Sequence, residues 1–149
     1  MKENERVNAS TTIYVLDSFA LLAYLGAEVG EERVKEILHD ASRGEICALL
    51  SLINLGEVVY ITERERGLAK AQEVLAIIEQ LPIEILPVDR QAVLGAAHVK
   101  AHYSVAYADA FAITAAQAHD GVLLTGDPEF EAVKDIVRIE WIGERSKSS

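Results

Sequence analysis

The clearest signals for the fold of this chain lie in the stretch Ile13-Tyr14-Val15-Leu16-Asp17-Ser18-Phe19-Ala20-Leu21-Leu22. Its first four residues form a short β-rich apolar run that ends at an acid, and a run this short is typical of a buried parallel strand. The residues from Ser18 to Leu25 are apolar and rich in alanine and leucine, which predicts a helix that starts beside Asp17. The stretch therefore predicts a strand followed by a helix, with Asp17 at the junction between them.

The same alternation of short apolar runs and longer helical patterns continues to the end of the chain. The predicted strands cover residues 13–16, 46–50, 83–88, 122–125 and 137–142. The predicted helices cover residues 18–25, 31–42, a segment from Ser51 or Asn54 to about Arg66, 68–81, 91–102 and 107–118, and a short helix starts at Pro128. This alternation predicts an α/β fold, a three-layer α/β/α arrangement with a five-stranded, mostly parallel sheet.

Length and charge limit the classes of protein that fit. The chain has 149 residues, 50% of them hydrophobic and 26% charged, which predicts one globular domain. We expect that domain to span residues 13–142, between a polar N-terminal lead over 1–12 and a polar C-terminal tail over 143–149. Lys and Arg total 14 against 24 Asp and Glu, and the net charge of −10 excludes a basic arm that wraps a duplex. It does not exclude a nucleic-acid enzyme, because bound divalent cations invert the local potential.

Cysteine use and hydropathy indicate a cytoplasmic protein. Cys47 is the single cysteine, so an intramolecular disulfide is excluded and a reducing compartment fits. The N-terminal residues lack the apolar core of a signal peptide. The longest apolar stretch, residues 19–27, is too short to span a bilayer, so we expect no membrane segment.

Four acids differ from the others because their sequence neighbours are apolar: Asp17, Glu57, Asp109 and Asp127. A charge in such surroundings is costly unless it is paired or bound to a metal. No Lys or Arg lies within four residues of any of them, so a local ion pair does not explain them. Asp17 and Asp127 each end a predicted strand, at the edge of an α/β sheet where ligands bind.

Helix capping is the simpler explanation for three of these acids, Asp17, Asp109 and Asp127, but it does not apply to Glu57 within its predicted helix. If all four converge on one crevice, they repel each other strongly unless a cation is bound. Carboxylate oxygens are the ligands that suit Mg²⁺ or Mn²⁺. The four acids together therefore favour a divalent metal site.

Four segments, in this order and spacing, resemble the PIN-domain ribonuclease family, and in particular the VapC-like toxins of type II toxin–antitoxin systems. The matching segments are Leu16-Asp17-Ser18-Phe19-Ala20-Leu21-Leu22, Asn54-Leu55-Gly56-Glu57-Val58, Ala108-Asp109-Ala110-Phe111-Ala112-Ile113 and Leu124-Thr125-Gly126-Asp127-Pro128-Glu129-Phe130. The resemblance covers nearly the whole chain, from about Ile13 to Ile142. It implies a five-stranded parallel sheet between helices and cleavage of single-stranded or loop RNA with Mg²⁺ or Mn²⁺. It also implies an antitoxin partner and a homodimer.

The same resemblance implies roles for individual residues. Asp17, Glu57, Asp109 and Asp127 match the family's acidic metal-site positions, which makes them the candidate catalytic residues. The polar residues that match supporting positions are Ser18, Asn54 and Thr125. The candidates for RNA contact are Arg64, Arg66 and Lys70 after the Glu57 helix, with Lys100 and His102 before Asp109.

As a hypothesis for the mechanism, two metals about 4 Å apart activate a water and stabilise the leaving oxygen of a phosphodiester displacement. Asp17 then anchors a metal, Glu57 and Asp109 are further ligands, and Asp127 binds the second metal or orients the water. A mechanism with one metal stays open.

Other functions stay open on the sequence alone. The chain is also consistent with a PIN-like RNA-processing nuclease outside a toxin–antitoxin system, or with an inactive metal-binding or interaction domain. An aspartyl phosphotransferase is disfavoured because Asp17-Ser18-Phe19 lacks a second acid two residues after the first. A receiver-like signalling domain is disfavoured because neither a paired acid nor a late lysine stands out. The apolar stripes of residues 18–25 and 52–60 fit either packing against the sheet or a partner helix.

Overall fold

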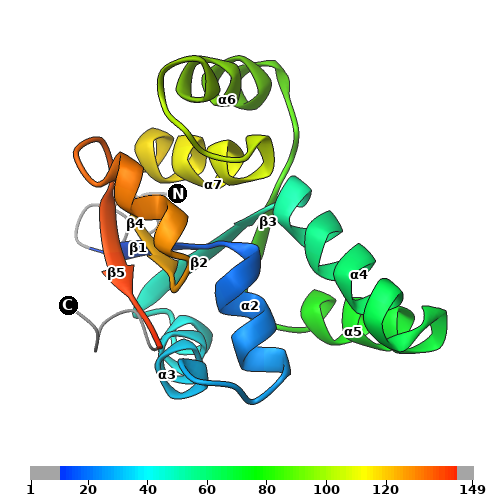
Figure 1. Ribbon diagram of the computed structural model, residues 1–149. Helices are drawn as coiled ribbons and strands as arrows, with labels where there is room; N and C mark the ends of the chain where they lie inside the picture. Colours follow the sequence, from blue (N-terminus) through cyan, green and yellow to red (C-terminus); the bar gives the residue numbers. More distant parts are fainter. Residues whose placement is uncertain (1–10, 144–149) are drawn as a thin grey trace.

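Five strands form one central sheet between two groups of helices in the computed structural model (Figure 1). The structure describes residues 11–143, so most of the predicted polar lead and tail, residues 1–10 and 144–149, lies outside the described residues. The elements in chain order are β1 (Thr12–Leu16), α2 (Ser18–Leu25), α3 (Glu31–Ser42), β2 (Ile46–Ser51), α4 (Leu52–Arg66), α5 (Leu68–Glu79), β3 (Glu84–Leu86), α6 (Arg90–His102), α7 (Tyr107–Ala118), β4 (Val122–Thr125), the 3₁₀ helix η1 (Pro128–Val133) and β5 (Arg138–Trp141). Within residues 11–143, none of the helices has both the length and the apolar character needed to span a bilayer.

The strand order in the sheet is β3-β2-β1-β4-β5, which places β1 in the centre. All four neighbouring pairs are parallel, so the predicted α/β fold is confirmed and the sheet is wholly rather than mostly parallel. Each crossover between strands contains helical structure, as parallel connections require. β2 and β3 are added on one side of β1, and the chain then returns to place β4 and β5 on the other side. The direction in which strands are added therefore changes between β1 and β4.

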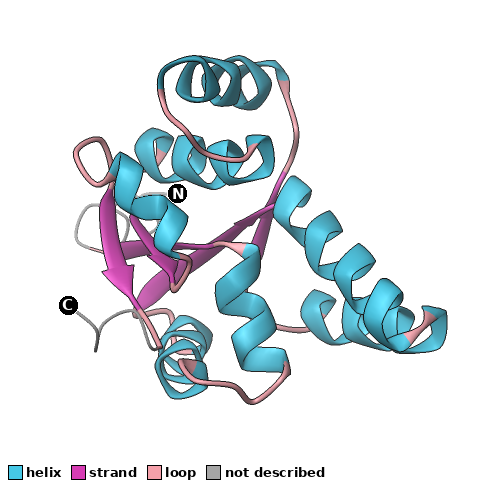
Figure 2. Cartoon of the chain, viewed as in Figure 1, coloured by secondary structure: helices cyan, strands magenta, loops and turns pink. Residues whose placement is uncertain are grey.

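Hydrophobic side chains fill both faces of the sheet because successive strand residues point to opposite faces. Val15 and Leu123 belong to a core with α6, α7 and η1, whereas Leu16 and Leu124 belong to a core with α2, α3, α4 and α5. Figure 2 shows the sheet edge-on between these two groups of helices. The layers therefore hold the carboxyl ends of β1 and β4 side by side in a rigid frame.

Local signals predicted most element bounds, and the exceptions have physical causes. The helices 18–25, 31–42 and 107–118 and the strand 122–125 have the predicted bounds. β3 is shorter than predicted, because Pro82 precedes it and Pro87 follows it, and proline has no N–H to donate to a ladder. Of the two predicted caps for α4, the structure uses Ser51, whose hydroxyl accepts from the Ile53 N–H at 3.1 Å.

Candidate metal centre

Asp17 is held at the carboxyl end of β1 by contacts to both of its oxygens. Oδ1 accepts a hydrogen bond from the Ala20 N–H at 2.8 Å and so caps α2. Oδ2 accepts a hydrogen bond of 2.5 Å from the hydroxyl of Thr125, the last residue of β4. The parallel pairing of β1 and β4, with Leu16 opposite Leu124, makes this contact possible. Asp17 is 2% exposed, so this carboxyl group is almost fully removed from water.

A tight loop positions Asp127 beside Asp17. The Asp127 N–H donates to Thr125 Oγ1 at 3.0 Å, and Asp127 Oδ1 caps η1 by accepting from the Glu129 N–H at 3.0 Å. Gly126 between them has no room for a side chain, because a Cβ would lie 2.3 Å from the Phe19 ring and 2.7 Å from the Ile142 carbonyl oxygen. The loop is therefore fixed by packing as well as by hydrogen bonds.

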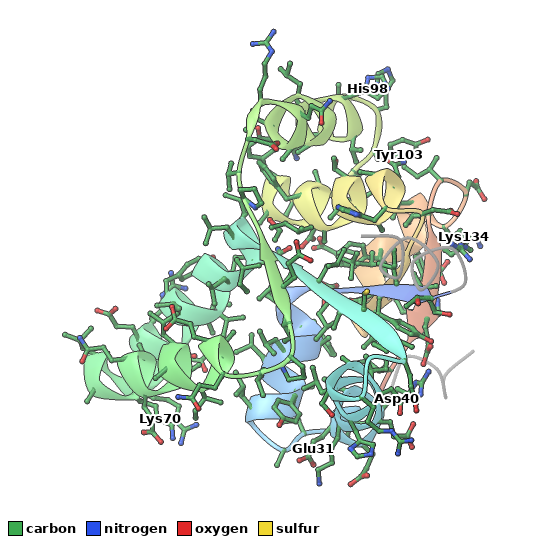
Figure 3. The ribbon with its side chains drawn as sticks, turned by 180° about the vertical axis from the view of Figure 1, so that it is seen from behind. Glu31, Asp40, Lys70, His98, Tyr103 and Lys134 are labelled. Carbon is green, nitrogen blue, oxygen red and sulfur yellow. The ribbon has the colours of Figure 1, made fainter. Side chains whose placement is uncertain are left out.

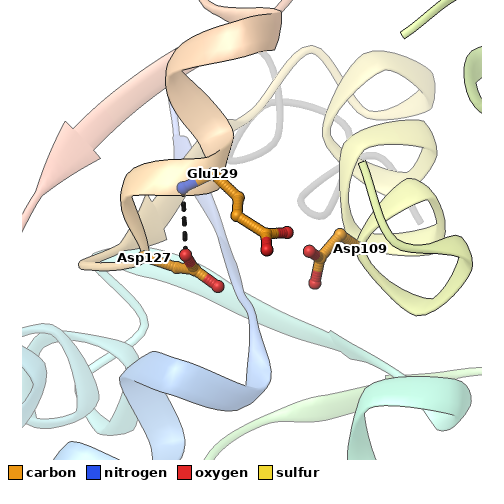
Figure 4. Close-up of side chains that lie close together, drawn as sticks. All are labelled: Asp109, Asp127 and Glu129. Atoms are coloured by element: carbon orange, nitrogen blue, oxygen red, sulfur yellow. Dashed lines mark hydrogen bonds between the residues drawn. The ribbon is translucent and has the colours of Figure 1, made fainter. Parts of the chain in front are cut away.

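Asp109, Asp127 and Glu129 form the tightest group of acids in the described part of the chain. Their carboxylate oxygens lie within 4.8 Å of one another, and Figure 4 shows the three side chains converging from α7 and η1. Asp109 is in the first turn of α7, but α7 has no side-chain cap, so capping does not explain this buried acid. Glu129 was not among the acids predicted for the site.

Asn54 connects Glu57 to the helix that carries Asp109. Its Nδ2 donates to Glu57 Oε1 at 3.0 Å and to the Ala108 carbonyl oxygen at 3.2 Å. Because both partners can only accept, the orientation of the amide is defined by its contacts. Asn54 is fully buried, and its Oδ1 has no hydrogen-bond partner among the described residues. One side chain thus fixes Glu57 against the start of α7.

Burial and mutual repulsion raise the pKa of two of these acids. The pKa of Asp17 rises to about 7 because of burial; the hydrogen bonds from Thr125 and Ala20 oppose the rise, and the charges of Asp127 and Glu57 add to it. The pKa of Asp109 also rises to about 7, first through burial and then through the charges of Asp127, Asp17, Glu57 and Glu129. The pKa of these two buried acids therefore depends on the charges of Glu57, Asp127 and Glu129.

No ion pair within residues 11–143 involves any of these five acids. Asp17 and Asp109 are buried, Glu57 and Asp127 are half-buried, and Glu129 is exposed. Buried acids close to other acids and without a cationic partner favour protonation or a bound cation. The oxygens that these acids offer to a cation are carboxylate oxygens. Such a donor set fits a hard divalent cation, Mg²⁺ or Mn²⁺, rather than a metal that prefers nitrogen or sulfur.

The remaining candidate residues lie in less specific positions. Ser18 is the first residue of α2 and is half-buried, without a side-chain hydrogen bond to another described residue. The Arg64 guanidinium lies over the Tyr60 ring, 5.1 Å from its centroid. Arg66 and Lys70 line a groove between α2, α4 and α5. Arg66 comes nine residues after Glu57 in the same helix, about 14 Å along its axis.

None of these cations forms an ion pair with the five acids within residues 11–143. Figure 3 shows Lys70 on α5 at the opposite end of the molecule from His98 on α6. The Lys100 ammonium donates to the Val105 carbonyl oxygen at 2.8 Å, and His102 Nδ1 lies 2.9 Å from the His98 carbonyl oxygen.

The sequence prediction does not include Glu129, because it rests on acids with apolar neighbours on both sides. A usable signal was present, since the predicted short helix from Pro128 places Glu129 in its first turn, directly after Asp127. The approach of Glu129 to Asp109 depends on how η1 packs over the sheet through the buried Phe130 and Val133.

Solved structures share this fold at low sequence identity. A VapBC2 complex from Rickettsia felis, bound to a DNA fragment from its promoter, matches with a TM-score of 0.68 at 19% identity over 88% of this chain and 99% of the other. A DNA-bound VapBC from Salmonella typhimurium matches with a TM-score of 0.69 at 22% identity over 87% and 98%. Mycobacterium tuberculosis VapC20, a sarcin–ricin loop cleaving toxin, matches with a TM-score of 0.65 at 17% identity over 82% and 95%.

These likenesses show the fold. No curated protein matches the sequence at a significant level. The sequence profile described as PIN domain matches residues 14–136, a range that begins in β1 and ends after η1. That range contains every element that contributes to the acid cluster, and the chain belongs to the PIN domain family.

Proposed function

We propose that this protein is a Mg²⁺- or Mn²⁺-dependent endoribonuclease that cleaves RNA phosphodiester bonds as a VapC-type toxin of the cytoplasm. The observation that carries the proposal is the group of carboxylate oxygens of Asp109, Asp127 and Glu129, within 4.8 Å of one another and without a basic partner among residues 11–143. Membership of the PIN domain family supports the same chemistry.

The residues of the site divide, in this proposal, into acids that hold the metal and residues that orient those acids. Asp17, Glu57, Asp109, Asp127 and Glu129 hold the metal. Thr125 and the N-terminus of α2 orient the Asp17 carboxylate, and Asn54 orients Glu57. Asp127 uses Oδ1 to cap η1, which leaves Oδ2 available for a metal or an attacking water. When bound, a divalent ion stabilises the negative charge that develops on the phosphate and lowers the pKa of a bound water.

An antitoxin segment is the partner that we propose for the groove between α2, α4 and α5. The groove has a volume of about 290 Å³, and its walls include Leu22, Leu25 and Ile77, with Arg66 and Lys70 among the polar lining residues. A groove between helices with both apolar and charged walls fits an amphipathic partner helix. Structures with this fold include a toxin–antitoxin complex from Klebsiella pneumoniae, which supports a partner of this kind. Leu52 and Tyr60, both exposed on α4, support a homodimer.

The decisive experiment compares RNA cleavage by the wild-type chain, Asp109→Asn and Asp135→Asn in Mg²⁺, Mn²⁺ and EDTA. Asp135 is an exposed acid outside the cluster and serves as the matched control. We expect metal-dependent cleavage by the wild type and by Asp135→Asn, and none by folded Asp109→Asn. Cleavage that persists in EDTA, or that is equal in both variants, would contradict the proposal. Metal binding without cleavage of any RNA in a mixed pool would favour the inactive binding domain.

A further inference from the structure

The ring of Phe19 lies at the border of the acid cluster and is partly open to solvent. Phe19 is the second residue of α2, two residues after Asp17, and 38% of it is exposed. The ring packs so closely on Gly126 that a Cβ added there would lie 2.3 Å from the ring atom Cε1 and 2.8 Å from Cζ. Gly126 joins Thr125 to Asp127, so the ring borders the segment that positions Asp17 and Asp127.

Two other aromatic side chains are comparably exposed in the described part of the chain, but their rings are already engaged. Tyr60, 48% exposed, has the Arg64 guanidinium 5.1 Å from its centroid. Tyr107, 46% exposed, packs edge-to-face on Phe111 with centroids 5.1 Å apart. Within residues 11–143, Phe19 makes neither a ring–ring nor a cation–ring contact. Phe19 is therefore an exposed aromatic residue next to the Gly126 segment whose ring has no ring or cation partner among the described residues.

The charge of the molecule makes such a ring important for RNA binding. The net charge is −10, and several cations are committed to acids, as in Arg33 with Glu140 and Arg138 with Asp120. Phosphate contacts from Lys and Arg are thus poorly supplied near the site, although they dominate the affinity of most RNA-binding surfaces. Stacking of a base on an aromatic ring does not need positive charge, and it requires a base that is unpaired.

We propose that Phe19 is the stacking platform for an unpaired base next to the phosphate that is cleaved. The inference rests on the proposed nuclease function and narrows its substrate to RNA in which a base can leave its stack. The bound metal then holds the phosphate, the Phe19 ring holds a neighbouring base, and RNA affinity depends only weakly on salt.

Changes made separately and together in the protein and in the RNA test whether a base stacks on Phe19. Cleavage kinetics in Mn²⁺ are measured for the wild type and Phe19→Leu on a short unstructured RNA of mixed sequence, and on a series of the same RNA with one abasic ribose at each position in turn. Leucine keeps an apolar contact to Gly126 but has no aromatic face. Leu94→Ala, at an apolar residue on α6 that is 52% exposed, is the matched control. Titration with Mn²⁺ alone checks that each variant keeps its metal site.

We expect Phe19→Leu to raise KM roughly five- to a hundredfold, the range for loss of one stacked base, with kcat nearly unchanged. One abasic position should weaken binding by the wild type to the same degree and have no further effect on Phe19→Leu. Leu94→Ala should retain the wild-type KM.

Four outcomes would overturn the inference. An unchanged KM for Phe19→Leu, in a wild type that cleaves RNA with metal, would refute the stacking role and leave the nuclease proposal intact. Additive losses at every abasic position would show that no base contacts the ring. An unchanged KM together with weaker self-association in sedimentation would make the ring a protein contact. Absence of metal-dependent cleavage by the wild type would refute the nuclease proposal itself, and the stacking role with it.

Discussion

Asp17 and Asp89 cap their helices in the same way but lie in different surroundings. Both have an extended backbone, with φ and ψ of −97° and −176° for Asp17 and −99° and −177° for Asp89. In both, Oδ1 accepts from the backbone N–H three residues later at 2.8 Å. Asp89 is exposed, whereas Asp17 is buried against Thr125 and near other acids. Local sequence makes both caps, whereas contacts with distant residues make Asp17 alone a candidate metal ligand.

The largest expected difference between the two caps is in catalysis. Asparagine also caps helices, so Asp17→Asn and Asp89→Asn both retain a side-chain acceptor for the helix N-terminus. We expect Asp17→Asn to lower metal-dependent RNA cleavage roughly a thousandfold, because several kcal/mol of transition-state stabilisation depend on the bound ion. Asp89→Asn should cleave like the wild type in the same assay. Equal activity of the two variants would remove Asp17 from the site.

The contact that Asp89 lacks is the hydrogen bond from Thr125, and Thr125→Val removes it with little change of shape. We expect a loss of roughly ten- to a hundredfold in Mn²⁺ affinity or activity, as for other groups that orient metal ligands. Thr114→Val is the matched control, because the buried Thr114 hydroxyl has no partner in the described structure. That change should be neutral or stabilising. Calorimetric titration with Mn²⁺ and thermal unfolding distinguish the two variants, and similar losses in both would contradict the orienting role.

The two caps should also differ in how they respond to pH. The pKa of Asp17 and of Asp109 is about 7 in the metal-free fold, above the ordinary value of 3.8. The folded chain then binds more protons than the unfolded chain between about pH 4 and 7, so the contribution of these acids to stability falls as pH rises. A divalent ion prefers the ionised carboxylates, so its affinity rises on the order of tenfold across the same pKa.

Thermal unfolding in EDTA and in Mn²⁺ at pH 5.5 and pH 8 measures both trends. The fall of stability with pH in EDTA should be shallower in Asp17→Asn than in the wild type and unchanged in Asp89→Asn. The same slope in all three proteins would show that burial of Asp17 does not control the pH response.

The smallest expected effect is at the exposed cap itself. Asp89→Ala removes the acceptor for the Ala92 N–H and should lower the free energy of unfolding by about 1 kcal/mol, with no effect on metal binding. Urea denaturation with and without Mn²⁺ measures this. A change in Mn²⁺ affinity in this variant would mean that the end of α6 communicates with the site.

Much of the fold was predictable because its signals are local. Pro128 at the start of η1, Asp89 before α6 and the short run before Asp17 each mark an element through nearby residues. The position of Asp17 and Asp127 at one sheet edge followed from the strand ends and the parallel class. The strand order did not, because the pairing of β1 with β4 depends on contacts far apart in the chain.

The site was only partly predictable for the same reason. Apolar neighbours singled out the buried acids, but they carry no information about Glu129, whose position depends on the packing of η1. Arg66 follows Glu57 on α4, but it lines the groove between α2, α4 and α5, about 14 Å along the helix axis from Glu57. The burial of Asn54 and its hydrogen bonds to Glu57 and Ala108 depend on the folded structure and leave no signal in the local sequence.

The hydrogen bond between Asp17 and Thr125 joins residues that are 108 positions apart in the sequence. A ribosome therefore releases the first acid of the site long before it makes the residues that complete it. An incomplete chain that ends before Thr125 contains Asp17 but lacks Thr125, Asp127 and Glu129, so it cannot assemble the cluster. Under the proposed nuclease function, the emerging chain therefore lacks its metal site while it is next to the RNA of its own translation machinery.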